Sequence, residues 1–519
     1  MPDLLGPRRR SAPLLLAALS ALYLVTPTAR PAAAEPPPRR PNIVFILTDD
    51  LDAVTMATLP SLKSLLADQG VNFSRFFVSD SLCCPSRASI LCGQYDHNHL
   101  VFDNGPRNGG YVRFNDLGHE QTTVATWLHD AGYRTVLMGK YLNGYPAGVE
   151  LTHVPPGWDE WYVPVRGTPY VEYDYSLNEN GSVVSYGRQP DDYLVDVLAG
   201  KARTFIQAAA ASEQPFFMYV APYAPHFPYT PPPRYEDAFP AAAAPRPPSF
   251  DEADTSDKPA WLQLLPPLTP KEVSDIDLTF RLRLEAMLAV QDLVRGIVDA
   301  LAAAGKLDDT YIFFTSDNGY HFGTHRLLPG KQTPYEEDLL VPLVVRGPGV
   351  PVGVTRSQLV GNVDFAPTFL ELAGAAARNE LDGHSMVPLL RQDASAVGSW
   401  RTAYLLEHSA VRTGSEPIRH IRLDEGTLEP ADPQKLIVPH SNLPGVPAFK
   451  GLRLQDRVYV EYDSGERELY DLRSDPWELA NIAKTADPAL LASLSSWLRV
   501  MSTCAGAGCR TADEVPAPQ

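Results

Sequence analysis

Four apolar runs of strand length constrain the fold most strongly, because each is continuous rather than alternating. They are Asn42–Thr48, 135–139, Phe216–Ala221 and 311–315. A continuous apolar run indicates a strand that is buried on both faces, as in a parallel sheet covered by helices. The sequence therefore predicts an α/β fold with an open sheet between helical layers.

Polar side chains follow each of these runs. They are Asp49 and Asp50, Lys140, His226, and Asp317 with Asn318. Ligands of open α/β sheets sit outside the carboxyl ends of the strands, so we expect these side chains at one edge. The acidic and amide groups offer only oxygen, which suits a hard cation, calcium first and magnesium second. Taken singly, each residue also fits a solvated or capping side chain.

A loop before residue 83 is predicted to deliver a cysteine onto a new helix. Pro85 suits the first helical turn, and Gly93 suits the end of the helix. A thiol at Cys83 would lie in the positive end of the helix dipole, with Arg87 one turn further on. This environment indicates sulfate or phosphate chemistry. The alternative is a pair of buried structural cysteines, Cys83 and Cys84.

The sequence pattern outside these motifs predicts three parts. They are a signal peptide over 1–34, a catalytic domain over 35–400 and a C-terminal α+β subdomain over 401–519. Helices are expected over 121–132 and 281–304, a surface excursion over 228–270, and a buried strand over 339–346. Three runs after residue 450, at 451–455, 457–462 and 467–471, predict a small antiparallel sheet. A final helix is expected over 487–501.

The N-terminus predicts export. Three arginines, an apolar stretch over 11–25 and Ala32-Ala33-Ala34 match a cleavable signal, and no later segment is long enough to cross a bilayer. We therefore expect a secreted or extracytoplasmic protein without a stable membrane anchor. The net charge of −18 argues against nucleic-acid partners. Five cysteines is an odd number; Cys504 and Cys509 can close a small disulfide, whereas Cys84 and Cys92 lie too far apart on one helix.

The pattern Cys83-x-Pro85-Ser86-Arg87 resembles the signature of the type I, formylglycine-dependent sulfatases. The likeness extends to the paired aspartates, Ala224-Pro225-His226, Asp317-Asn318-Gly319 and Glu-Leu-Tyr-Asp-Leu near the end. Within the family, residues 139–143, 341–349 and 504–510 look most like N-acetylglucosamine-6-sulfatases. The resemblance implies an alkaline-phosphatase-like mixed sheet sandwiched by helices, with a smaller C-terminal antiparallel sheet. It also implies hydrolysis of 6-O-sulfate esters on N-acetylglucosamine-type sugars of sulfated glycans.

The same resemblance assigns roles to residues. Cys83 would be oxidised by a formylglycine-generating enzyme to the nucleophile, and would also face the metal. Calcium would be held by Asp49, Asp50, Asp317 and Asn318. The sulfate ester would be held or protonated by Arg87, Lys140, His226 and Lys331.

One position departs from the family. Many sulfatases have Gly-Lys-x-His, where this chain has Leu142, so a base is needed elsewhere; His321 is our candidate and His325 the second choice. Three other functions remain open. They are an arylsulfatase, a phosphonate or phosphate monoester hydrolase of the same fold, and a non-catalytic sulfoglycan-binding protein in which Cys83 is never converted.

Overall fold

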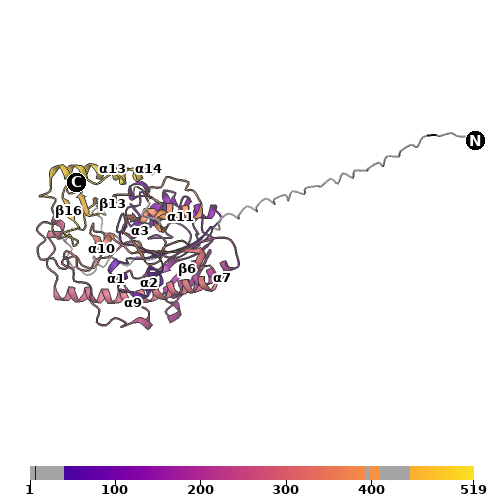
Figure 1. Cartoon of the computed structure of the whole chain (residues 1–519). Helices are drawn as coiled ribbons and strands as arrows, with labels where there is room; N and C mark the ends of the chain where they lie inside the picture. The colour runs from indigo at the N-terminus through magenta and orange to yellow at the C-terminus, as the bar shows by residue number, and fades with distance from the viewer. Residues whose placement is uncertain (1–5, 7–39, 393–396, 399, 410–444, 519) are drawn as a thin grey trace, which may run out of the picture. The chain divides into compact units, whose positions relative to one another are not determined.

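The computed structural model describes residue 6 and residues 40–392, 397–398, 400–409 and 445–518. The chain from Arg40 onward forms one compact unit (Figure 1). The predicted signal peptide lies outside the described residues except for Gly6, and the division at residue 400 stays a prediction. Among the described residues, no helix combines the length and the apolar character that a membrane crossing requires.

A ten-stranded mixed sheet forms the centre of this unit. Its order is β11 (Val354–Arg356), β2 (Val71–Phe73), β10 (Leu343–Arg346), β9 (Thr310–Ser316), β1 (Asn42–Thr48), β8 (Phe216–Ala221), β4 (Arg134–Gly139), β5 (Glu160–Gly167), β6 (Tyr175–Glu179) and β7 (Ser182–Tyr186). The four predicted strands β9, β1, β8 and β4 are neighbours and run parallel. Their carboxyl ends therefore meet at one edge, as predicted.

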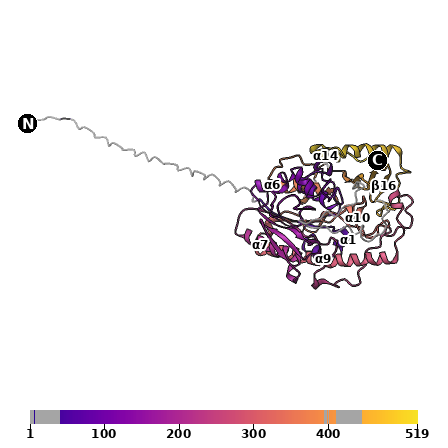
Figure 2. The same ribbon diagram turned by 180° about the vertical axis from the view of Figure 1, so that it is seen from behind.

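The two faces of the sheet bury separate cores. On β1, Ile43, Phe45 and Leu47 face one core and Val44 and Ile46 the other, so every residue of the strand is buried. The first core contains residues of α3 (Cys83–Cys92), α6 (Val124–Asp130) and α11 (Phe365–Ala373), and the second those of α2 (Pro60–Leu65), α7 (Leu194–Ala210) and α9 (Pro270–Ala303). Figures 1 and 2 show α7 and α9 on one side of the sheet and α6 on the other. This explains the continuous apolar runs.

Shorter elements complete the unit. They are α1 (Ala53–Ala57), α4 (Asp96–His99), α5 (Gly110–Asp116), α8 (Ala260–Gln263), α10 (Glu336–Leu339) and the two-stranded pair β3 (Phe76–Phe77) and β12 (Val360–Gly361).

Two predicted boundaries were wrong. Helix α9 begins at Pro270, eleven residues before the predicted start, because Thr269 caps it by accepting a hydrogen bond from the Glu272 amide. The predicted strand over 339–346 combines the end of α10 with β10, which starts at Leu343 and runs antiparallel to β9.

The C-terminal part is a four-stranded antiparallel sheet with two helices. Its strands are β13 (Ala403–His408), β14 (Phe449–Leu454), β15 (Arg457–Tyr462) and β16 (Arg467–Asp471), followed by α13 (Pro488–Met501) and α14 (Ala507–Asp513). The last three strands and α13 confirm the prediction. The sequence analysis missed β13 and α14.

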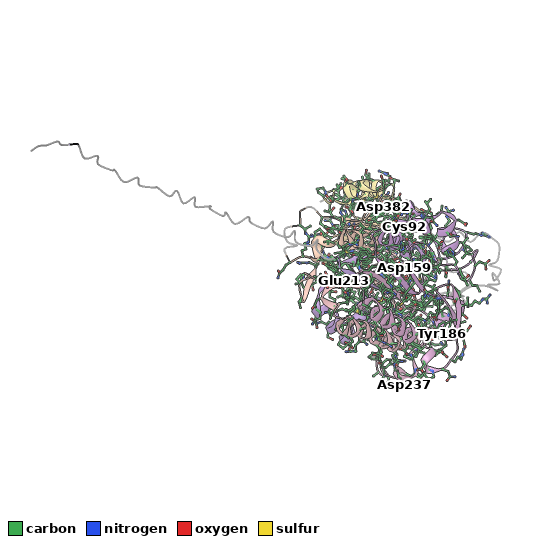
Figure 3. The ribbon with its side chains drawn as sticks, turned by 90° about the vertical axis from the view of Figure 1, so that its right-hand side faces the viewer. Cys92, Asp159, Tyr186, Glu213, Asp237 and Asp382 are labelled. Atoms are coloured by element: carbon green, nitrogen blue, oxygen red, sulfur yellow. A yellow bond between two sulfur atoms is a disulfide. The ribbon has the colours of Figure 1, made fainter. Side chains whose placement is uncertain are left out.

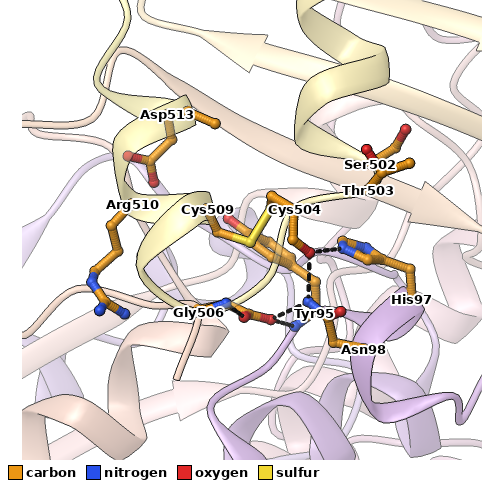
Figure 4. The surroundings of a disulfide bond; sticks show 12 residues. Tyr95, His97, Asn98, Ser502, Thr503, Cys504, Gly506, Cys509, Arg510 and Asp513 are labelled. Carbon is orange, nitrogen blue, oxygen red and sulfur yellow. Dashed lines mark hydrogen bonds between the residues drawn. A yellow bond between two sulfur atoms is a disulfide. The ribbon is translucent and has the colours of Figure 1, made fainter. Parts of the chain in front are cut away.

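The predicted disulfide between Cys504 and Cys509 is present (Figure 4). The Cys504 carbonyl accepts a hydrogen bond from Asn98 Nδ2 at 2.9 Å and lies 2.9 Å from His97 Nε2, which fastens the C-terminal segment to α4. Cys83, Cys84 and Cys92 remain thiols. Gly93, which follows Cys92, accepts a hydrogen bond at its carbonyl from the Asp382 amide at 2.8 Å. Figure 3 labels Cys92 and Asp382.

Candidate active site

Helix α3 places Cys83 at its first position, immediately beyond the carboxyl edge of the sheet. Leu82 before it is extended, and Gly93 ends the helix with φ +68°, a conformation that suits glycine. All ten residues of α3 are buried. The Cys83 thiol donates to Asp49 Oδ1 at 3.3 Å and accepts from Lys331 Nζ at 2.9 Å. Burial and the adjacent Asp49 raise the pKa of this thiol well above its usual value, so it stays protonated.

Acidic and amide groups from β1 and β9 meet beside this thiol. Thr48 pairs with Ser316 at the strand ends, so the residues that follow lie side by side. The Asp50 amide donates to Asp317 Oδ1 at 3.1 Å, and Asn318 Nδ2 donates to Asp50 Oδ1 at 2.7 Å. The structure therefore brings together the four predicted metal ligands, including Asp49.

Three cations compensate these carboxylates. Arg87 Nε donates to Asp317 Oδ2 at 2.8 Å, and its Nη1 donates to the Lys140 carbonyl at 2.9 Å. The Lys140 ammonium pairs with Asp49, and the Lys331 ammonium with Asp50. Each predicted sulfate-binding cation thus contacts a predicted metal ligand directly.

His226 reaches the same place from the loop after β8. Its Nδ1 lies 2.8 Å from the Phe227 carbonyl, and its Nε2 lies 3.6 Å from Asp50 Oδ2. His226 is 7% exposed and Lys331 9%, whereas Cys83 and Asp49 are 0% exposed. His226 and Lys331 are therefore the members of the cluster nearest to solvent.

The carboxylates differ in how well they are compensated. Burial alone would raise the pKa of Asp49, but the charges of Lys140, His226, Arg87 and Lys331 hold it below its usual value. For Asp317, burial and the neighbouring Asp49 raise the pKa to about 6, against the effect of Arg87. A further positive charge beside Asp317 would stabilise its ionised form.

The donor set fits a divalent cation. Asp49, Asp50, Cys83 and His226 offer ligand atoms that all lie within 4.8 Å of one another. Asn318 Oδ1 is buried and has no hydrogen-bond partner among the described residues, so an amide oxygen is left for a ligand. The His226 nitrogen was not part of the oxygen-only prediction.

His321 does not suit the role of a base. Its Nδ1 lies 2.8 Å from Asp338 Oδ1, and its Nε2 lies 2.8 Å from the Leu328 carbonyl. Two acceptors favour a proton on each nitrogen, and Asp338 raises the pKa of His321 although burial alone would lower it. Backbone hydrogen bonds between His321 and Gly330 instead support the turn that precedes Lys331. His325, the second choice, pairs with Glu252.

Sequence reasoning also missed residues that surround the cluster. The Lys140 ammonium lies 5.1 Å from the ring centroid of Tyr170 and 5.9 Å from that of Tyr223. No local pattern marks Tyr170. Arg283 of α9 is fully buried behind the cluster, and its place within the apolar stripe of that helix was a signal that could have revealed it.

Comparison with known proteins adds independent observations. The family model named Sulfatase matches residues 41–375. Human N-acetylglucosamine-6-sulfatase is 38% identical over 484 residues, which covers 91% of this chain and 86% of the human protein.

Two solved structures share the fold. One is a complex with its substrate D-glucosamine-2-N,6-O-disulfate, at TM-score 0.70 and 24% identity over 92% of this chain and 99% of that one. The other is the phosphonate monoester hydrolase of Agrobacterium radiobacter, at TM-score 0.64 and 22% identity over 89% and 96% of the two chains.

Proposed function

The chain belongs to the sulfatase family and is a sulfuric ester hydrolase, and we propose that it removes 6-O-sulfate from N-acetylglucosamine-type sugars of sulfated glycans. The fold is the expected alkaline-phosphatase-like mixed sheet with a C-terminal antiparallel sheet. The observation that carries the proposal is the convergence of Cys83, Asp50 and Lys331 at one buried point. The identity to human N-acetylglucosamine-6-sulfatase supports the choice of sugar.

We propose that Cys83 is converted to formylglycine by a formylglycine-generating enzyme. The position of Cys83 supports this, because its side chain contacts both Asp49 Oδ1 and Lys331 Nζ at the centre of the cluster. The ligand set for calcium is Asp49, Asp50, Asp317 and Asn318, joined by the side chain at position 83. When both groups are present, the aldehyde hydrate supplies a hydroxyl nucleophile and the metal lowers the pKa of that hydroxyl.

The protein's own residues supply the remaining chemistry. Arg87, Lys140 and Lys331 place positive charge where the sulfuryl oxygens gain negative charge, and their buried setting strengthens this effect. His226 or Lys331 donates a proton to the departing sugar oxygen. Both lie nearest to solvent, on the side from which a sugar has to enter, which supports this assignment.

The disulfide of the C-terminal part bears on the location of the protein. A disulfide such as Cys504–Cys509 forms and persists in oxidising compartments. We therefore assign the protein to an extracytoplasmic location, in agreement with the predicted signal peptide.

A substrate panel tests the function. Values of kcat/KM are compared for N-acetylglucosamine 6-sulfate, glucosamine N,6-disulfate, an aryl sulfate and paired phosphate and phosphonate monoesters. We expect a sugar 6-sulfate to have the highest value. Preference for the aryl sulfate would make the protein an arylsulfatase, and preference for a phosphonate would make it a phosphonate hydrolase.

The mass of the peptide that contains Cys83 tests the maturation. Conversion makes it about 18 Da lighter than the thiol form, whereas a retained thiol can still be alkylated. A fully retained thiol, together with binding of sulfated glycan and no turnover, would favour the non-catalytic binding protein.

A further inference from the structure

Arg283 lies on the long helix α9, which covers one face of the sheet (Figure 1). Its side chain is 0% exposed, although arginine is rarely buried completely. The guanidinium lies 4.2 Å from the ring centroid of Tyr320, and its partners lie beyond the carboxyl edge of the sheet. A buried arginine is costly unless its charge is compensated, so the partners of Arg283 indicate what it does.

The guanidinium contacts three of the loops that carry the site. Nη2 donates to the carbonyl of Asp50 and, at 2.9 Å, to Oδ2 of Asp52, in the loop after β1. Nη1 donates to the Pro225 carbonyl at 3.2 Å, in the loop after β8 that carries His226. Tyr320, on which the guanidinium packs, follows Asn318 in the loop after β9. One side chain thus contacts all three loops.

The contact with Asp50 concerns a strained residue. Asp50 has φ +65°, the left-handed conformation, which is unfavourable for a residue with a side chain. In this conformation the carbonyl points to Arg283, while the carboxylate accepts hydrogen bonds from Asn318 and Lys331. Without Arg283, the buried carbonyl would lose its charged donor, and the left-handed conformation would lose a contact that holds it.

We propose that Arg283 is a positioning residue, which fixes the Asp50 carboxylate and the His226 loop in the geometry that binds the metal and acts on the sulfate ester. This inference rests on the proposed function of the same site. Partners of metal ligands typically contribute about 10–100-fold to metal affinity or activity, which sets the size of the expected effect. A merely structural Arg283 would affect stability and leave both quantities unchanged.

The test uses the purified, converted enzyme with Arg283→Met and Arg283→Lys. Calcium affinity is measured by titration calorimetry after removal of bound metal, and kcat and KM are measured on one sugar 6-sulfate. For Arg283→Met we expect calcium affinity and kcat each to fall by about 10-fold or more, with KM changed less than threefold. Arg283→Lys keeps the charge but reaches fewer acceptors, so we expect a partial recovery of kcat.

Arg401→Met provides the matched control. The Arg401 side chain is also 0% exposed, and its guanidinium donates to Asp364 at 2.8 Å and to Asp513 at 2.9 Å, with no contact to the cluster among its described hydrogen bonds. This variant should lower the melting temperature and leave calcium affinity and kcat within twofold of wild type.

Two results would overturn the inference: both Arg283 variants within twofold of wild type in calcium affinity and kcat, or Arg401→Met with the same losses. If Arg283→Met does not fold, the same criteria apply to Arg283→Lys. If the wild-type enzyme takes up no calcium, the metal in the proposed function is wrong, and the kcat values of the Arg283 and Arg401 variants decide the inference alone.

Discussion

The ammonium nitrogen of Lys331 lies 2.9 Å from the sulfur of Cys83, and it also pairs with the carboxylate of Asp50. A residue far along the chain thus bridges the expected nucleophile and an expected metal ligand. Backbone hydrogen bonds between Gly330 and His321 hold the turn that carries this lysine. The arrangement makes the roles of individual side chains testable.

Cys83, and not Cys84, is expected to be essential. Cys83→Ala should abolish turnover, because no nucleophile can form. Cys84→Ala should stay active and lose on the order of 1 kcal/mol of stability, since Cys84 packs in the core. Assays of both variants on a sugar sulfate check this, and an inactive Cys84→Ala beside an active Cys83→Ala would reverse the assignment.

Substrates with different leaving groups identify the proton donor. A sugar alkoxide needs protonation far more than a phenolate does, so loss of the acid should slow sugar sulfates by about 100-fold or more and aryl sulfates much less. We expect this difference for His226→Ala or for Lys331→Ala. Equal losses on both substrate types in both variants would show that neither residue is the acid.

Metal removal should abolish activity, and calcium should restore it. Asp317→Ala should also lose stability, by about 3 kcal/mol or more, because it leaves the buried Arg87 guanidinium without its carboxylate. Dialysis against a chelator followed by calcium titration, with thermal melts of the variant, provides the measurements. Full activity in excess chelator after long dialysis would contradict the metal assignment.

His321→Ala should reduce stability rather than the chemistry of sulfate release. The substitution removes the buried pair with Asp338, whose carboxylate also accepts a hydrogen bond from the Thr333 amide at 2.9 Å. Thermal melts should show a lower melting temperature. Mass spectra during turnover should show no accumulated sulfated enzyme, and the appearance of such an adduct would restore His321 as the base.

Stability should fall in mild acid because of His408. Burial lowers the pKa of this residue to about 4, below the 6.5 of an exposed histidine. The unfolded chain therefore binds more protons between pH 6.5 and pH 4, and the free energy of unfolding falls as the pH is lowered through this window. At pH 5 the loss is about 2 kcal/mol relative to pH 7.

His408→Gln isolates this effect. The Asp80 carboxyl lies 3.3 Å from His408 Nδ1, and burial and Asp96 raise the pKa of this carboxyl. A raised carboxyl pKa increases stability as the pH falls, which is opposite to the effect of His408. Because Asp80 is present in the wild type and in His408→Gln, its effect cancels when the two are compared. Denaturant unfolding at pH 7 and pH 5 measures the difference between the two proteins. An identical pH dependence in wild type and His408→Gln would contradict the assignment.

The sequence predicted the central strands well because burial on both faces leaves a continuous apolar run, as in β1 and β8. It also predicted which side chains meet, since parallel strands end at one edge. The direction in which a loop side chain points could not be predicted. His321 follows Asn318 by three residues, yet its described hydrogen bonds run to Asp338 and Leu328, because the turn geometry of the loop is set by distant partners.

Other features depended on tertiary contacts that no local pattern encodes. Strand β13 is recognisable mainly through its pairing with β14, from which it is separated by residues 409–448. The place of Arg283 within the apolar stripe of α9 indicates burial, but its partners are known only once α9 is placed under the strand ends. The C-terminal helix α14 follows a glycine-rich segment that gives little helix signal and is fastened by the Cys504–Cys509 disulfide.

The complete burial of α3 has a consequence for the order of events during biosynthesis. Cys83 and the nine residues after it are helical and buried. A modifying enzyme therefore cannot bind this segment as an extended peptide once the sheet and helices have assembled. Any enzymatic conversion of Cys83 must therefore precede folding, and protein that has folded with its thiol intact keeps that thiol.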